Sequence, residues 1–344
     1  ALRTRFGLTQ AARVGWYASQ SYAGTRLAAR VGRTLPKVPP PKIEAPGGIP
    51  PRPRLLRHVQ ELLARDLANV EAGLYPMPED EPDGITGLFQ RRLMYLRDLP
   101  NVVRRRAEQS HQEVDRATGK RPRYYLQNFH FQTDGWMSER SAKLYDTQVE
   151  TLFMGAAAAM RRQALVPVAE LAARTDQRKL KALDVASGSG SFLRDLSRAF
   201  PRLPVIASDL SEPYVGRARA KLSPSAGGAV VAAAEDLPFA EGSLDLITNI
   251  YLFHELPPKI RAAVAAEFAR VVRPGGTVVI VDSLQTGDTP ELDGLLELFP
   301  QMFHEPYYRS YLTTDFASLF QSAGLTLEAS WPAFVSKVFV FRKE

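Results

Sequence analysis

The sequence predicts an α/β fold built on a doubly wound sheet of seven strands, and two observations lead to this prediction. From residue 181 onward, apolar runs of strand length alternate with helical patterns, and the loop after the first run, residues 186–190, consists almost entirely of glycine and serine. Parallel strands need helices to connect them, and ligands of such sheets bind beyond the carboxyl ends of the strands. The residues before 181 predict a helical cap, preceded by a basic extended N-terminal arm.

The expected strands are short runs rich in apolar and β-branched residues between turn signals. They lie at 181–184, 205–209, 229–234, 243–253, 277–281, 326–331 and 334–341. Helical patterns separate them at 192–196, 211–222, 258–271 and 316–324. Ser211 is a typical N-cap, and Pro258 begins the third helix in the first turn, where proline is tolerated. In this order Asp184, Asp209 and Asp282 end strands and face one crevice.

The loop between the first strand and its helix predicts a nucleoside ligand. Glycines at a strand end let a ligand approach the backbone beside the helix N-terminus. Asp209 ends the second strand nineteen positions beyond Gly190, where a carboxylate can accept hydrogen bonds from both ribose hydroxyls. Because the loop lacks both the Gly-Lys-Ser/Thr ending of a phosphate-binding loop and the full G-x-G-x-x-G spacing, polyphosphate ligands are disfavoured.

The same loop, Asp184-Val-Ala-Ser-Gly-Ser-Gly190, resembles motif I of the class I S-adenosylmethionine-dependent methyltransferases, D-x-G-x-G-x-G, with one glycine replaced by Ala186. Residues 235–239, 242–247 and 273–276 resemble the later motifs of that family in the same order. The segments EDLPF, LFHELP and RVVRPGG are most similar to the subgroup that contains the ubiquinone and menaquinone C-methyltransferases. The resemblance covers residues 124–344.

This resemblance implies a Rossmann-like fold, S-adenosyl-L-methionine as cofactor, and O- or C-methylation of a small apolar or aromatic acceptor. The residues that it implies for cofactor binding are Asp184, Ala186, Ser187, Gly188, Gly190, Asp209, Leu210, Glu235, Asp236, Leu237 and Asn249. The sequence departs from the family at Ala233, where relatives carry an aspartate that contacts the adenine amine. Either Glu235, Asp236 or backbone groups replace it, or cofactor affinity is reduced.

Aromatic residues before motif I and in the lid predict the acceptor pocket. By the resemblance, residues 124–180 form cap helices and residues 283–312 a lid insert, and the candidates for the pocket wall are Tyr125, Trp136, Tyr145, Tyr251, Phe303 and Tyr307. The alternative is that these rings only pack the helical subdomain onto the core. For an acceptor that needs a general base, His254, His304 and His130 are the candidates in that order, although a lone histidine is more often structural.

Composition excludes several classes of site. The chain has no cysteine, which excludes disulfides, cysteine nucleophiles and thiolate metal sites, and the sequence predicts no metal site. No run of eighteen apolar residues exists, so no membrane span is expected. Residues 1–60 contain eleven Lys and Arg and one acid, a local net charge of +10 against +7 for the whole chain. The remaining residues therefore sum to −3, and the basic character belongs to the N-terminal region.

Residues 1–53 are expected to form a retained basic arm and a proline-rich linker, followed by a small helical subdomain at 54–123 whose role the sequence does not indicate. The contact side of the arm is expected at Leu8, Ala12, Trp16 and Leu27, with glycines that weaken any long helix. Such an arm docks on an anionic membrane or a protein partner, is a solvated tail, or is an organelle transit peptide. Nucleic acid is disfavoured, because no RNA-binding motif is present.

Two functional hypotheses remain open from the sequence. The first is a methyltransferase of small molecules in the cytoplasm, associated with a membrane, or alternatively in a mitochondrial or plastid matrix. The second is a non-catalytic subunit with the methyltransferase fold that docks on a larger complex or membrane. Ala233 and the arm favour the second hypothesis, and the intact Asp184, Gly188 and Asp209 favour the first.

Overall fold

A seven-stranded sheet forms the centre of the protein, as the sequence predicts. The structure is a computed structural model that describes residues 1–81, 83–114, 121–222 and 227–344. The strand order is β3-β2-β1-β4-β5-β7-β6, with β1 to β5 parallel and β7 antiparallel to both of its neighbours. The strands are β1 (Ala182–Val185), β2 (Val205–Asp209), β3 (Gly227–Val231), β4 (Leu244–Ile250), β5 (Val272–Ser283), β6 (Leu325–Ala333) and β7 (Ser336–Lys343).

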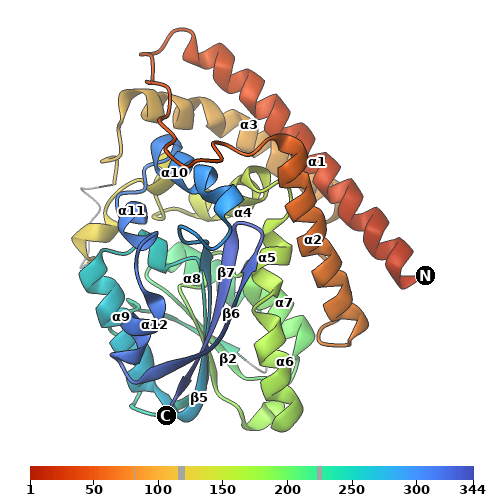
Figure 1. Ribbon diagram of the computed structural model, residues 1–344, viewed down its shortest axis with the longest axis vertical. Helices are drawn as coiled ribbons and strands as arrows, with labels where there is room; N and C mark the ends of the chain where they lie inside the picture. The colour runs from red at the N-terminus through yellow and green to blue at the C-terminus, as the bar shows by residue number, and fades with distance from the viewer. Residues whose placement is uncertain (82, 115–120, 223–226) are drawn as a thin grey trace.

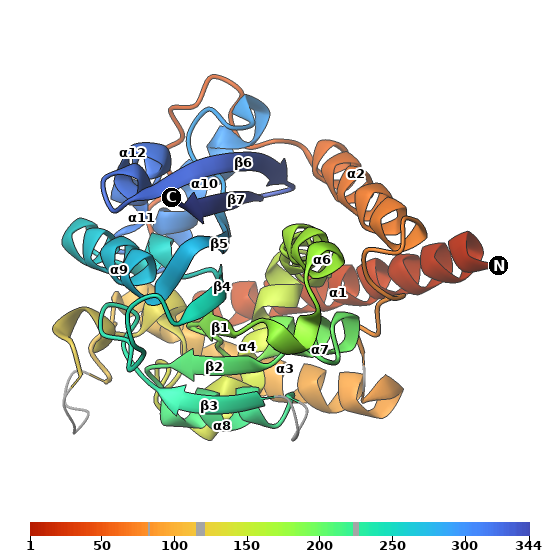
Figure 2. The same ribbon diagram turned by 90° about the horizontal axis from the view of Figure 1, so that it is seen from below.

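Helices cover both faces of the sheet because alternate strand residues point to opposite sides (Figure 2). On one face, Ile280 belongs to a core cluster that includes residues of α9 (Pro258–Val271) and α12 (Phe316–Gln321). On the other, Val281 packs in a cluster with residues of α6 (Leu165–Arg174) and α7 (Ser191–Ala199). The helix α8 (Glu212–Arg219) packs against β2 and β3. The central strands β1, β4 and β5 are thus buried on both faces, as their continuous apolar runs require, whereas the edge strands β3 and β6 are partly exposed.

A layer of N-terminal helices lies across one end of the sheet (Figure 1). It contains α1 (Leu2–Gly32), α2 (Arg52–Glu71), α3 (Gly84–Glu108), α4 (Glu139–Leu152) and α5 (Ala157–Arg162). The lid insert folds as α10 (Asp293–Met302) and α11 (Tyr308–Tyr311), and short 3-10 helices are η1 (Arg123–Tyr125), η2 (Phe129–Phe131), η3 (Gln177–Lys179), η4 (Phe253–Glu255) and η5 (Pro290–Leu292). Along the described residues, no helix combines the length and apolar character needed to span a bilayer.

The prediction of an extended N-terminal arm is wrong for residues 2–32, which form one helix packed against α3 and α4. Gly24 lies inside this helix and permits close packing with α3. An added Cβ at this position would lie 3.1 Å from the Tyr95 hydroxyl. The helix buries Phe6 and Tyr17 against the rest of the protein, whereas Leu8, one of the residues expected to contact an outside partner, is 69% exposed. The buried face carries Gln10, Arg13 and Gln20 as well, which hides it from a search for apolar periodicity.

The proline-rich linker runs in an extended conformation over the lid helix α10. The backbone N–H groups of Glu44 and Ala45 donate to Glu297 Oε2 at 2.6 and 3.0 Å. Gly294 allows the closest approach, because a Cβ at this position would lie 1.9 Å from the Gly48 carbonyl oxygen. The linker is therefore attached to the half of the chain that contains the sheet.

A buried arginine joins the helical layer to the core. The guanidinium of Arg162 in α5 donates to Asp66 of α2 at 2.6 Å and to Asp80 of the following loop, and lies 3.5 Å from Asp195 of α7. All four side chains are almost inaccessible to solvent. Removing one partner from such a group leaves uncompensated buried charge.

We expect Arg162→Ala to lower the free energy of unfolding by about 3–5 kcal/mol, because it leaves Asp66 and Asp80 without their cation. Urea unfolding followed by circular dichroism measures this loss. The matched control is Arg178→Ala, which breaks the ion pair of a 68% exposed side chain with Asp176 and should leave the free energy of unfolding almost unchanged, because solvent screens exposed pairs. Equal effects of the two variants would show that the buried group does not hold the layers together.

Candidate functional site

The loop after β1 adopts a backbone that leaves one side open. Ala186, Gly188 and Gly190 have positive φ angles of 54°, 55° and 76°. At Gly190 an added Cβ would lie 2.7 Å from Cα of Ala218, so this glycine serves the packing of the loop on α8. At Gly188 an added Cβ would meet no atom of the described residues within 4 Å. Gly188 therefore leaves room for a ligand to approach the backbone.

Two carboxylates support this loop. Asp209 at the end of β2 accepts hydrogen bonds from the backbone N–H groups of Gly188 and Ser211, both at 2.9 Å. Burial raises the pKa of Asp209 to about 6, against the effect of these hydrogen bonds. Each of its oxygens retains a lone pair for a further donor. Asp184 accepts from Thr248 Oγ1 at 2.6 Å, and burial raises its pKa to about 7.

A cavity opens between the loop and the cap. Of the predicted cofactor residues, Asp184, Ala186, Ser187, Gly188, Asp209 and Leu210 line it. Of the predicted acceptor residues, Tyr125, Trp136, Tyr145 and Tyr251 line it. The structure thus places the predicted cap residues Tyr125, Trp136 and Tyr145 on the same cavity wall as the glycine loop, which lies about forty or more positions later in the sequence.

Other predicted residues lie outside the cavity wall: Gly190, Glu235, Asp236, Leu237, Asn249, Phe303, Tyr307 and the three histidines. Leu237 is buried in the core, and Asp236 is exposed. Asn249 donates its side-chain amide to the Val185 carbonyl at 2.8 Å, which ties β4 to β1. Glu235 accepts from the hydroxyl of Tyr124 at 2.7 Å, and Tyr124 lines the cavity.

Sequence reasoning missed two charged residues of the wall, Arg161 and Asp146. Arg161 donates to Glu150 at 2.6 Å, and its Nε is buried without a hydrogen-bond partner among the described residues. Asp146 accepts from Ser189 Oγ at 2.5 Å; burial opposes its charge, but Lys221 and Arg161 lower its pKa well below the usual range. Both residues lie on helices that carry no binding motif, so no sequence signal distinguished them.

The wall also contains rings and an acid that the prediction did not include. These residues are Tyr124, Phe129, Tyr214 and Glu255. Phe129 stacks on Trp136 with ring centroids 4.6 Å apart. The density of aromatic residues in residues 124–145 was a usable signal for the ring wall, but it did not distinguish lining residues from packing residues.

The three predicted histidines lie behind the cavity or away from it. Nδ1 of His254 is 2.6 Å from Oδ1 of Asp282. Burial alone would lower its pKa, but Asp282, Glu255 and Glu305 outweigh burial and raise the pKa to about 9. Nε2 of His130 lies 3.2 Å from Oε1 of Glu255, and burial, with His254 and His304, lowers the His130 pKa to about 3.

His304 does not join the other two histidines in one group. Its Nε2 contacts Oε1 of Gln127 at 2.6 Å, and its ring stacks on His111 with centroids 4.0 Å apart. These contacts give His304 a packing role. Among the described residues, no hydrogen bond or ring contact joins His304 to the glycine loop.

The comparisons with known proteins agree with the motifs. The profile of a family described as a methyltransferase domain matches residues 182–276. An uncharacterised methyltransferase of Synechocystis sp. is 31% identical over 147 residues, which are 43% of this chain and 67% of that protein. A ubiquinone/menaquinone biosynthesis C-methyltransferase of Desulfotalea psychrophila is 27% identical over 151 residues, 43% of this chain and 58% of that protein.

Among solved structures, a TehB-like S-adenosylmethionine-dependent methyltransferase from Corynebacterium glutamicum aligns with a TM-score of 0.42 and 20% identity. The alignment covers 60% of this chain and all of that one.

We expect Ala186→Gly to raise the free energy of unfolding by about 1 kcal/mol, because a left-handed conformation costs a residue with a Cβ about 1–2 kcal/mol, of which glycine's larger unfolded-state entropy offsets a part. Urea unfolding measures the change. The control is the reverse substitution, Gly216→Ala, at a position with ordinary helical backbone where an added Cβ meets no atom of the described residues within 4 Å. This change should stabilise the chain as well, because alanine favours a helix over glycine. A loss of stability in Ala186→Gly would contradict the assigned backbone conformation.

Proposed function

Since the chain belongs to the class I S-adenosylmethionine-dependent methyltransferases, we propose that it methylates a carbon or an oxygen of a small aromatic or apolar acceptor. S-adenosyl-L-methionine is its cofactor. The observation that carries the proposal is the wall of aromatic rings that faces the glycine loop across the cavity. Flat rings bury large apolar area and favour stacked or edge-on contact with another ring.

The cavity wall fits the cofactor at three places. Gly188 leaves the backbone accessible, and Asp209 offers carboxylate oxygens to ribose hydroxyls. Arg161 and Asp146 are opposite charges on the same wall, and the methionine end of the cofactor carries a carboxylate and an ammonium group. We propose that Arg161 binds this carboxylate and Asp146 this ammonium. The Nε of Arg161 that lacks a partner among the described residues supports the first assignment.

At the adenine end the wall is apolar. Ala232 and Ala234 line the wall here. Ala233 stands where relatives carry an aspartate, and its backbone forms a bridge with that of Asp236. Glu235 is occupied by the hydroxyl of Tyr124. We propose that the adenine is held mainly by apolar contact here, with Glu235 reached only through Tyr124.

The bound cofactor supplies a methyl group on a sulfonium, whose departure leaves a neutral thioether. The protein therefore needs to align the acceptor and exclude water, and such positioning can supply about 7–11 kcal/mol. An acceptor hydroxyl or acidic carbon must also lose a proton. Glu255 is the acid on the cavity wall that contacts the histidines behind it, with Oε1 3.7 Å from Nε2 of His254. We propose that the proton leaves toward Glu255.

The test combines cofactor binding with methyl transfer. Calorimetry should show binding of S-adenosylmethionine and S-adenosylhomocysteine, and Asp209→Ala should weaken binding by about 1.5–3 kcal/mol, or roughly 10- to 150-fold. Asp176→Ala, at an exposed ion pair, is the matched control and should leave affinity unchanged. Methyl-labelled cofactor should then label quinols and phenols rather than amines or carboxylates. Binding without transfer to any of these acceptors would favour the non-catalytic assembly role.

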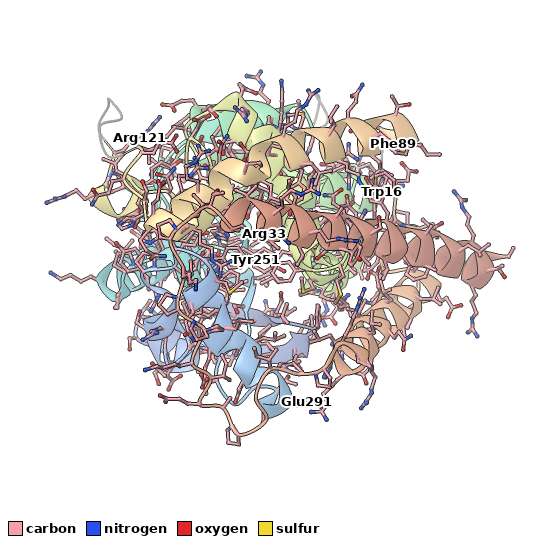
Figure 3. The ribbon with its side chains drawn as sticks, turned by 90° about the horizontal axis from the view of Figure 1, so that it is seen from above. Trp16, Arg33, Phe89, Arg121, Tyr251 and Glu291 are labelled. Atoms are coloured by element: carbon pink, nitrogen blue, oxygen red, sulfur yellow. The ribbon has the colours of Figure 1, made fainter. Side chains whose placement is uncertain are left out.

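We also propose that the face formed by α1 and α3 docks on an anionic membrane surface. Ile85, Phe89 and Leu93 form an exposed apolar stripe on α3, with spacing that places them on one side of the helix. Phe89 packs edge-on against Trp16 of the adjacent α1, at 4.9 Å between centroids (Figure 3). The first sixty residues supply the excess of basic charge. Apolar and basic groups together are typical of helices that lie in a membrane interface.

Co-sedimentation with vesicles measures this docking. We expect binding to vesicles rich in phosphatidylserine and little binding to neutral phosphatidylcholine, with a loss at high salt because exposed charges are screened beyond about 8 Å at physiological ionic strength. Phe89→Glu should reduce binding, whereas Val231→Glu, at an exposed apolar residue of β3, should not. Equal binding of the two variants would exclude the stripe as the docking surface.

A further inference from the structure

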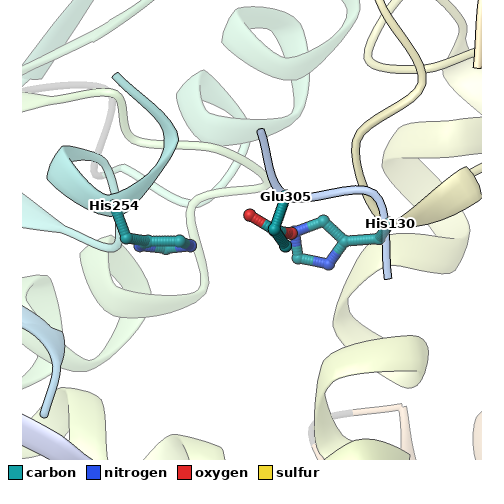
Figure 4. A group of neighbouring side chains, drawn as sticks. All are labelled: His130, His254 and Glu305. Carbon is teal, nitrogen blue, oxygen red and sulfur yellow. The ribbon is translucent and has the colours of Figure 1, made fainter. Parts of the chain in front are cut away.

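Behind the cavity wall, four segments bring together a group of imidazoles and carboxylates, which are buried except for the half-buried His130. His130 lies in η2, His254 and Glu255 in η4, Asp282 near the end of β5, and Glu305 just beyond α10. One ligand atom from each of His130, His254 and Glu305 lies within 4.8 Å of the others. Figure 4 shows the carboxylate of Glu305 between the two rings. Ligand atoms from three side chains converge in this way at sites that bind a metal ion.

The hydrogen bonds of His254 suit a metal ligand. Its Nδ1 is held by Asp282 at 2.6 Å, and Asp282 is itself fixed by the backbone N–H groups of Phe253 and Ser283, both at 2.7 Å. Metal-binding histidines usually donate the other ring N–H to a carboxylate in this way, which fixes the tautomer and the ring orientation. Nε2 of His254 is then the nitrogen available for a ligand, on the side of Glu255.

Glu305 provides a second, independent observation. Its side chain is 0% exposed, and neither carboxylate oxygen has a hydrogen-bond partner among the described residues, although Oε1 lies 2.8 Å from Nε2 of His130. That contact is close but lacks hydrogen-bond geometry. Two ligand atoms of the same metal ion have such a geometry. Each lies about 2.1 Å from the metal, so the two atoms are close together although neither donates a hydrogen bond to the other.

The buried carboxylates of the group outnumber its imidazoles. Glu255, Glu305 and Asp282 are buried carboxylates around two imidazoles. The neighbouring Arg261 directs its donors to the carbonyls of Phe253 and Tyr307 and to hydroxyl groups rather than to these acids. A buried carboxylate without a partner is costly, so it takes up a proton or a cation. A divalent ion satisfies the unpartnered Glu305 and both ring nitrogens at once.

We propose that His130, His254 and Glu305 bind one divalent first-row transition-metal ion, with Zn²⁺ the preferred ion, next to Glu255 at the back of the cavity. Two imidazoles and a carboxylate are a ligand set typical of zinc and of other late first-row ions. Asp282 orients His254, and Glu255 lies 3.2 Å from Nε2 of His130. The proposal goes beyond methyl transfer and holds whatever the acceptor is. The sequence predicted no metal site, because its ligands share no local motif.

Metal analysis of the tag-free wild-type protein tests the site without any variant. After purification with Zn²⁺ present and exhaustive dialysis, plasma mass spectrometry should find about one zinc per chain. After removal of zinc with dipicolinate, titration with Co²⁺ should produce visible absorption bands that saturate at one equivalent. Protein that retains less than a tenth of an equivalent of zinc, and that gives no cobalt spectrum, would overturn the proposal.

Variants then locate the ion. Glu305→Gln and His130→Ala should each weaken metal binding at least ten-fold. The matched control is His58→Ala: His58 also faces two carboxylates, Glu61 at 3.4 Å and Glu291 at 2.8 Å, but these are 62% and 39% exposed. A zinc content unchanged in Glu305→Gln and His130→Ala but lost in His58→Ala would place the ion on the surface and refute the site. Calorimetry with S-adenosylhomocysteine on the same samples separates this outcome from a failure of cofactor binding.

Discussion

Two consecutive buried arginines of α5 hold the other N-terminal helices to the sheet domain, because α5 is itself packed into the core of the sheet through Met160, and Arg162 reaches Asp195 of α7 at 3.5 Å. Arg162 binds Asp66 and Asp80, while Arg161 turns to Glu150, which also pairs with Arg13 of α1 at 2.8 Å. Buried charges are tolerated only with partners of this kind, because the desolvation of each ion costs several kcal/mol. The partners come from α1, α2 and α4 and the loop after α2, so these elements cannot leave the core without exposing or orphaning charge. The N-terminal helices are therefore part of the catalytic fold.

The same layer supplies the cavity with its chemistry. Rings from η1 to α4 face the glycine loop, and Arg161 reaches the wall from the network that holds the layer in place. Stability and ligand binding thus share one set of contacts. At the back of the cavity, Glu255 belongs both to the wall and to the group around His254 and His130. An ion bound there would lie beside the cavity, where a fixed charge acts on whatever group the cavity holds.

Much of the fold could be predicted from the sequence because its signals are local. Strand and helix periods, the turn at 186–190 and the acid at Asp209 each depend on neighbouring residues, and the structure has the seven strands where these patterns lie, with ends displaced by a few residues. The motif also indicated which side of the sheet carries the site. The helix α1 was the main failure in the fold. Its buried face mixes Gln10, Arg13 and Gln20 with apolar residues, and polar positions of this kind become interior only when distant partners satisfy them.

By itself, then, the sequence determined the methyltransferase architecture, the glycine loop and the ring-rich segment ahead of it, because each is written in residues close together along the chain. Only the tertiary structure decided which side chains share a surface. It placed Arg161 and Asp146 on the cavity wall, moved His304 away from it, and brought Glu305 to His130 across 175 positions, from Glu305 at the end of the lid to His130 in the cap. Charge compensation between distant residues produces these pairings, and no local pattern records them.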